Sequence, residues 1–233
     1  MDPTRLDEAS LEETFAAPAA SSLRTGRVTM DDVVMRTATL FAVLVAVGAF
    51  AWGANNPALA LVGFLGGFAL AMVNIFSKKV RVPLIVAYAA AQGLALGTIS
   101  RIYNEAYSGI VGQAVIGTLC AFGGILLAYR SGKIRVTPKF TRILLGSLMG
   151  YFVFAIITMF TGFPGGTTGL LIAVAGVALA TFFLVLDFDQ IERTIAAGAP
   201  QEESWRMAFG LMVTIVWLYM EVLRLISILR SGD

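Results

Sequence analysis

Long apolar segments alternate with short polar stretches along most of this chain. A helix needs about 20 apolar residues to cross the roughly 30 Å hydrocarbon core of a bilayer. The uncharged run 143–186 is too long for one crossing, and the turn sequence TGFPGGTTG divides it into two helices. The pattern therefore predicts seven membrane-spanning helices, at residues 36–53, 57–77, 82–103, 109–129, 140–161, 167–187 and 206–229.

Composition supports the same conclusion. Of the 233 residues, 58% are hydrophobic and only 14% charged, and the mean hydropathy is +0.81. This is more apolar surface than a single soluble core of that size could bury, so we expect an all-α integral membrane protein. Residues 1–30 differ, because acidic and basic residues flank the Ala/Pro/Ser-rich stretch FAAPAASS; we expect a disordered cytoplasmic tail there.

Basic residues predict the orientation of the helices. They gather in KKVR at 78–81 and in the segment 130–142, whereas GANNPA at 53–58 has none. Positively charged loops tend to stay in the cytoplasm, so the N-terminus is expected inside and, after seven crossings, the C-terminus outside. Arg224 and Arg230 lie near that outer end, which leaves open a last segment that re-enters the membrane.

The rest of the composition excludes several functions. Cys120 is the single cysteine and histidine is absent, which excludes an intrachain disulfide, a thiolate zinc site and a histidine base. The net charge of +2 is small and dispersed, so nucleic acid is not an expected partner. A bound cation would need oxygen ligands, which favours calcium or protons. Paired glycines in the apolar segments predict close helix packing: Gly63 and Gly67, Gly93 and Gly97, Gly123 and Gly124, Gly146 and Gly150.

Two carboxylates occur in unusual places. Asp187 directly follows the apolar run FFLVL, and Glu221 lies inside the last apolar segment. Carboxylates are costly in hydrocarbon and often mark ion or proton sites. The structural alternatives are that Asp187 reaches water at the interface and that Glu221 pairs with Arg224 at i,i+3 spacing. Asp189 and Arg193, four residues apart, are also expected to pair on the helix surface.

Three motifs give the chain a family resemblance. DFDQI around Asp187, LYMEVLRLI around Glu221 and QGLALGTIS in 82–103 occur in the order and helix positions of the Bax-inhibitor (transmembrane Bax inhibitor motif) family, bacterial branch. The chain resembles that family over residues 30–230. The resemblance implies two three-helix layers around a central C-terminal helix, and a pH-sensitive calcium leak across the bacterial plasma membrane. It also implies a gating pair of carboxylates with perturbed pKa values, matched here by Asp187 and Glu221, the latter in place of an Asp.

The chain departs from the family pattern at three points. Gln92 stands where many relatives carry an acid in the third helix, which removes one candidate ion ligand. The family has an arginine latch in the second helix, whereas 57–77 carries no charge; the counter-charge would have to come from Lys78, Lys79, Arg142 or Arg224. The segment between the two acids is also longer than in the family, so a register one turn earlier, near Trp217, fits the helix ends equally well.

The functional hypothesis from sequence is a pH-gated calcium leak channel, not an enzyme. Two acids in one dry site would titrate as a unit and shift an open–closed equilibrium. Asp189 and Glu192 would form the cation mouth, calcium would be the permeant or weakly bound ion at Asp187 and Glu221, and no other cofactor is expected. The alternatives are a non-conducting scaffold that regulates a membrane protease or stress-response complex, with the tail as contact, and a two-carboxylate intramembrane hydrolase, for which no substrate motif is visible.

Overall fold

The described part of the chain is all helical. The structure is a computed structural model that describes residues 26–132 and 134–232, and these residues form seven α-helices and no named strand. All seven are long and apolar enough to cross a membrane, which confirms the predicted helices. They are α3 (Met30–Ala54), α4 (Ala58–Phe76), α5 (Val82–Ala106), α6 (Ile110–Arg130), α7 (Pro138–Thr161), α8 (Gly166–Ala196) and α9 (Glu203–Ser231).

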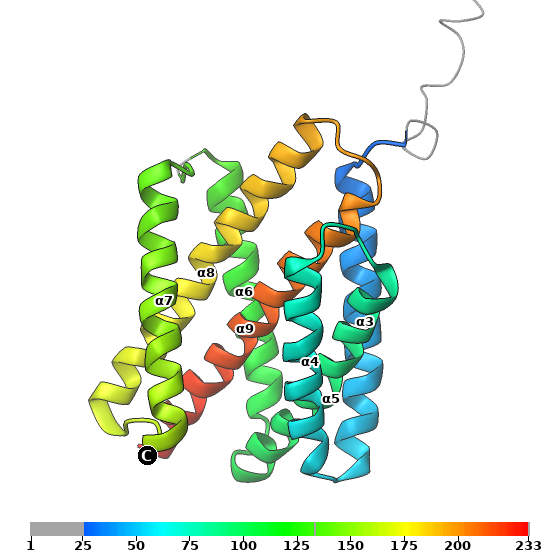
Figure 1. Cartoon of the computed structure of the whole chain (residues 1–233). Coiled ribbons are helices and arrows are strands. Elements are labelled where there is room, and N and C mark those ends of the chain that lie inside the picture. The colour runs from blue at the N-terminus through cyan, green and yellow to red at the C-terminus, as the bar shows by residue number, and fades with distance from the viewer. Residues whose placement is uncertain (1–25, 133, 233) are drawn as a thin grey trace, which may run out of the picture.

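The helices form two layers around α9. Helices α3, α4 and α5 lie on one side, α6, α7 and α8 on the other, and α9 runs obliquely between them (Figure 1). Helix α9 contacts α3, α5, α6 and α8, and half of its most apolar stretch is buried inside the protein. This confirms the central C-terminal helix that the family resemblance implied.

Helix α3 begins six residues before the predicted start at residue 36, because the sequence supplies a helix cap. The Thr29 side chain accepts a hydrogen bond from the Asp32 backbone N–H (3.2 Å), and the Asp32 carboxylate accepts one from the Thr29 N–H (3.1 Å). This reciprocal capping box satisfies two backbone donors at the helix start.

The predicted tail therefore ends earlier than residue 30. The Val28 N–H donates to the Ala199 carbonyl (2.9 Å), and the Gln201 N–H donates to the Gly26 carbonyl (2.9 Å). These bonds fix residues 26–29 against the loop between α8 and α9. The remainder of the predicted tail, residues 1–25, lies outside the described residues.

Helix α8 does not end at Asp187 as predicted but continues to Ala196. The residues after Asp187 have helix-compatible side chains, and the predicted Asp189–Arg193 pair is confirmed, with Nε and Oδ2 2.6 Å apart. Such an i,i+4 pair stabilises a helix. Gly198, whose φ of +65° suits glycine, follows the helix end. Asp187 therefore lies within a long helix and not at its interfacial end.

Glycine packing holds the α3–α4–α5 layer together. A Cβ on Gly63 would lie 2.5 Å from the Ala95 nitrogen of α5, and a Cβ on Gly97 would overlap the Gly48 carbonyl oxygen of α3. Close approach of small residues is the expected packing mode in membranes, so the prediction is confirmed for these two and for Gly67 and Gly93. It is wrong for four others, beside which a Cβ would meet no atom within 4 Å: Gly123, Gly124, Gly146 and Gly150.

We expect Gly97→Leu to destabilise the protein and Gly146→Leu to leave it unchanged. Overpacking a tight site typically costs about 1–3 kcal/mol of stability. At Gly97 the added side chain would meet backbone atoms of Gly48, which cannot rotate away as a flexible side chain could. The measurement is thermal unfolding of both variants and the parent in the same detergent. An equal loss in both variants would contradict the close α3–α5 packing described here.

Candidate functional site

The two predicted carboxylates lie at separate places along the antiparallel pair α8 and α9. A Cβ on Gly210 of α9 would lie 3.8 Å from Asp187 Oδ1, and a Cβ on Gly176 of α8 would lie 2.5 Å from Glu221 Oε2. Each acid thus faces a glycine on the neighbouring helix. Asp187 lies eleven positions after Gly176, and Glu221 lies eleven positions after Gly210, which is about 16 Å along each helix.

The predicted pairing of Asp187 with Glu221 is therefore wrong. Because the helices run in opposite directions, the continuation of α8 past its predicted end and the start of α9 at Glu203 set a register in which Gly210, not Glu221, faces Asp187. The alternative register near Trp217 is also not the one observed. The two acids form neither a shared titrating unit nor a joint calcium site, and the hydrolase alternative loses its carboxylate pair.

Asp187 occupies an enclosed position between α8 and α9. Its Oδ2 atom is shielded from solvent and has no hydrogen-bond partner. The Thr214 side chain of α9 lies beside the carboxyl, and its hydroxyl donates to the Gly210 carbonyl at 3.3 Å. An enclosed polar atom without a partner is rare in folded proteins and marks a position of functional interest.

None of the four predicted counter-charges pairs with Asp187 in the described residues. Lys78 and Lys79 lie in the loop between α4 and α5, where Arg206 of α9 donates to the Lys78 carbonyl at 3.0 Å. Arg142 is exposed on α7. Arg224 pairs with Glu221 instead. The arginine latch expected from the family therefore has no replacement at Asp187.

Glu221 is a buried acid that is neutralised by an arginine of its own helix. It is only 2% exposed, its Oε2 lies 3.1 Å from Arg224 Nη1, and its Oε1 accepts a hydrogen bond from Trp217 Nε1 at 3.0 Å. Arg224 also donates to the Tyr151 hydroxyl of α7 at 3.1 Å. The structural alternative, an intrahelical i,i+3 pair, is confirmed for Glu221. We call these four residues the Glu221 cluster.

The Glu221 cluster joins α9 to α7. The Tyr151 and Trp217 rings lie 5.9 Å apart, and the Arg224 guanidinium lies 4.8 Å from the centre of the Phe163 ring, in the loop between α7 and α8. Sequence reasoning missed Tyr151 and Trp217. The i,i+4 spacing of Trp217 and Glu221 could have indicated their contact, whereas nothing local points to Tyr151, 70 positions before Glu221.

The predicted cation mouth is occupied by protein contacts. Asp189 pairs with Arg193, and Glu192 accepts a hydrogen bond from the Tyr129 hydroxyl at 2.7 Å. No group of three or more acidic, histidine or cysteine side chains that could hold a metal occurs among the described residues. Tight calcium binding needs several carboxylate and carbonyl oxygens around the ion. The described part of the chain has no cluster of carboxylates that could supply them.

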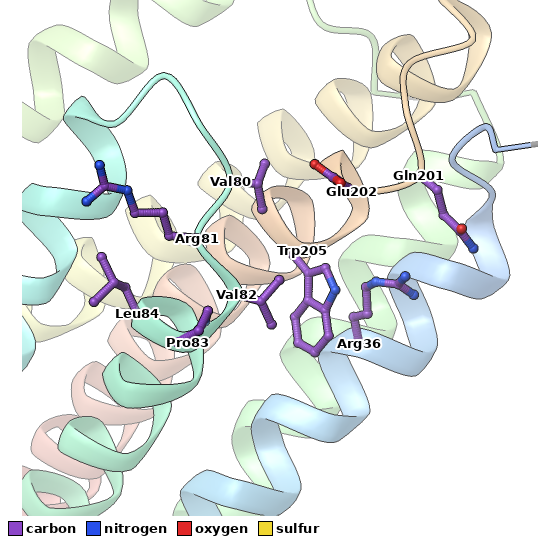
Figure 2. A pocket seen from close by; sticks show the side chains of 9 residues that line it. All are labelled: Arg36, Val80, Arg81, Val82, Pro83, Leu84, Gln201, Glu202 and Trp205. Atoms are coloured by element: carbon purple, nitrogen blue, oxygen red, sulfur yellow. The ribbon is translucent and has the colours of Figure 1, made fainter.

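A cavity of about 550 Å³ opens at the end of the molecule where α9 begins. Figure 2 shows Trp205 lying between Arg36 of α3 and Val82 of α5 in its wall. The Arg36 guanidinium lies 5.2 Å from the centre of the Trp205 ring, a cation–π contact, and also pairs with Asp32 at 3.4 Å. The cavity thus has a charged wall, but Asp187 does not line it.

Removing one partner of the buried ion pair should be strongly destabilising. We expect Arg224→Met to lower the free energy of unfolding by about 3 kcal/mol or more, because it leaves the Glu221 charge enclosed. Tyr151→Phe, which removes one hydrogen bond, should cost about 1 kcal/mol. The double variant Glu221→Gln with Arg224→Met should recover part of the loss in denaturant or thermal unfolding. A single-variant loss no larger than that of Tyr151→Phe would contradict the enclosed ion pair.

The comparison with protein-family models gives a match over nearly the whole chain. The model described as Bax inhibitor 1 like matches residues 7–231. A comparison with curated proteins finds no match. The match begins in the acidic N-terminal segment, earlier than the resemblance noted in the sequence, and includes all seven helices. The chain therefore belongs to the Bax inhibitor 1 like family.

Proposed function

We propose that this protein is a pH-sensitive cation leak channel of the bacterial plasma membrane, with calcium as the permeant ion and Asp187 as its titrating group. The observation that carries the proposal is the Oδ2 atom of Asp187, enclosed between two membrane-spanning helices without a hydrogen-bond partner. Ionisable side chains at such positions are rare and typical of ion and proton pathways. The gate proposed here needs one carboxyl group and not a pair.

The position of Asp187 connects its protonation to the packing of the whole bundle. A protonated carboxyl can donate a hydrogen bond, whereas an ionised one can only accept. Asp187 faces Gly210 and lies beside Thr214 of α9, and α9 contacts both layers of helices. A change of charge at this contact would therefore alter the packing of the central helix against its neighbours.

A single carboxyl group favours a graded leak over an all-or-none switch. If the pKa of a group differs by one unit between two conformations, its titration shifts their equilibrium about tenfold. A shift from 1:99 to 99:1 needs about 5.5 kcal/mol, or four such units. One acid is thus expected to modulate a leak by about an order of magnitude.

The proposed orientation has the N-terminal side in the cytoplasm. The α4–α5, α6–α7 and α8–α9 loops lie at the same end of the molecule as the start of α3 (Figure 1), and two of them carry the basic clusters of the sequence. The C-terminus lies at the opposite end and is proposed to be outside.

Arginines near the outer end have protein partners. Arg101 pairs with Glu105 at 2.7 Å, Arg224 pairs with the acid of its own helix, and Arg230 donates to the Ser108 carbonyl at 2.8 Å. Their charges are therefore engaged by protein groups. This supports a last helix that crosses the membrane, although the sequence alone left a re-entrant segment open.

The proposal is tested by calcium uptake into sealed liposomes that contain the purified protein, scanned from about pH 6 to 8. We expect pH-dependent uptake in the parent and no pH dependence in Asp187→Asn, because the titrating group is gone. Asp189→Asn is the matched control, since it changes the same residue type on the same helix but one that is paired with Arg193. It should keep the parent profile.

Two results would contradict the proposal. A parent-like pH profile in Asp187→Asn would eliminate Asp187 as the titrating group. Uptake no greater than that of empty liposomes at any pH would eliminate the channel and favour a non-conducting scaffold that regulates a membrane protease or stress-response complex.

A further inference from the structure

A groove runs along the outside of the bundle between its two layers. Residues 30–41 of α3 form one wall and residues 118–130 of α6 the other, while Phe188 of α8 and Leu211 of α9 contribute to the floor. Its volume is about 600 Å³, and most of the lining is apolar. Ligand sites typically have volumes of about 300–1,000 Å³, so the groove is large enough for a bound molecule.

The walls of the groove face the bilayer. Val34 of α3 is 59% exposed and Leu119 of α6 is 63% exposed, so the side chains on both walls are open to the surroundings. Both walls belong to membrane-spanning segments. The molecules that surround these side chains in the membrane are therefore lipids.

The length of the groove matches one leaflet. Residues 30–41 of a helix extend about 16 Å, which is half of the roughly 30 Å hydrocarbon core. A transmembrane helix of a partner would need a contact surface along the full core. A lipid acyl chain occupies one leaflet only, so the dimensions favour a lipid over a partner helix.

A basic side chain lies at the end of the groove. Arg130, in the last turn of α6, lines it and is exposed, and it makes no ion pair with the rest of the described chain. Glu192 lines the same end, but its carboxylate accepts the Tyr129 hydroxyl. Arginine binds phosphate oxygens well, and basic pockets between helices at a membrane surface are typical lipid headgroup sites.

We propose that the groove binds one acyl chain of a phospholipid whose phosphate contacts Arg130. Phe188 and Leu211, in the floor of the groove, follow directly in sequence after Asp187 and after the Gly210 that faces it. The bound acyl chain would therefore pack against residues of α8 and α9 that adjoin the contact between Asp187 and Gly210. The inference does not depend on ion conduction, and it applies equally to a non-conducting protein.

The test is native mass spectrometry of the full chain, delipidated in detergent and then mixed with phosphatidylglycerol or with diacylglycerol of the same acyl chains. The parent is expected to retain phosphatidylglycerol about fivefold better than diacylglycerol, the effect of one basic residue near an anionic group. Arg130→Gln should abolish that preference and leave diacylglycerol retention unchanged.

Two tryptophan variants separate the groove from the rest of the lipid-facing surface. Ala38 is exposed and lines the groove, so Ala38→Trp should fill it and abolish retention of both lipids. Ala49 is also exposed and lies on nearly the same face of α3, about three turns further on and outside the lining. Ala49→Trp should retain both lipids like the parent.

Three results would overturn the proposal. They are parent-like lipid retention in Ala38→Trp, an unchanged preference for phosphatidylglycerol in Arg130→Gln, and a dimer of the parent that Ala38→Trp abolishes. The last would identify the groove as a contact between two copies of the chain. Thermal unfolding of each variant beside the parent distinguishes loss of binding from loss of folding.

Discussion

The antiparallel contact of α8 with α9 is the constraint that determines where the two buried carboxylates of this protein lie. In this contact each helix presents a glycine to an acid of the other, Gly176 to Glu221 and Gly210 to Asp187. A side chain at Gly176 would overlap the Glu221 carboxylate, so the close approach of the helices at this point depends on a glycine there. The register separates the two acids by about three helical turns. Any mechanism for this protein therefore has to treat them as independent groups.

The two acids differ in how their charge is compensated. Glu221 has a guanidinium, an indole N–H and a neighbouring tyrosine hydroxyl, contributed by α7 and α9. Asp187 lies beside Thr214 and has no hydrogen-bond partner at its enclosed Oδ2 atom. A buried acid that is paired with an arginine stays ionised and stabilises one packing arrangement. An acid without such a partner changes its protonation state more readily when its surroundings change. Glu221 is thus suited to a structural role and Asp187 to a responsive one.

The helices were predictable from the sequence because hydropathy over about 20 residues is a strong local signal. The i,i+3 pair of Glu221 with Arg224 was also readable, since both residues lie on one helix. The register of α8 against α9 was not predictable, because it depends on where α8 ends and on how α9 tilts. The charged residues after Asp187 suggested a loop, whereas α8 continues to Ala196. Glycine patterns gave a partial answer. They indicate where helices can approach one another, but no other helix packs closely against Gly146 in the described structure.

The placement of the two acids also bears on how the response proposed for Asp187 would fit within a stable bundle. The Glu221 cluster ties α9 to α7 near the C-terminal end of α9, so that end has charge-assisted hydrogen bonds that resist separation of the helices. Asp187 faces the first half of α9, where glycine and threonine provide little side-chain bulk. The start of α9 is held as well, because Arg206 donates to the Ser77 and Lys78 carbonyls and the Gln201 N–H donates to the Gly26 carbonyl. Under the proposed function, a change of charge at Asp187 would therefore act on the α8–α9 packing between two held ends of α9, and this needs less rearrangement than opening the whole contact.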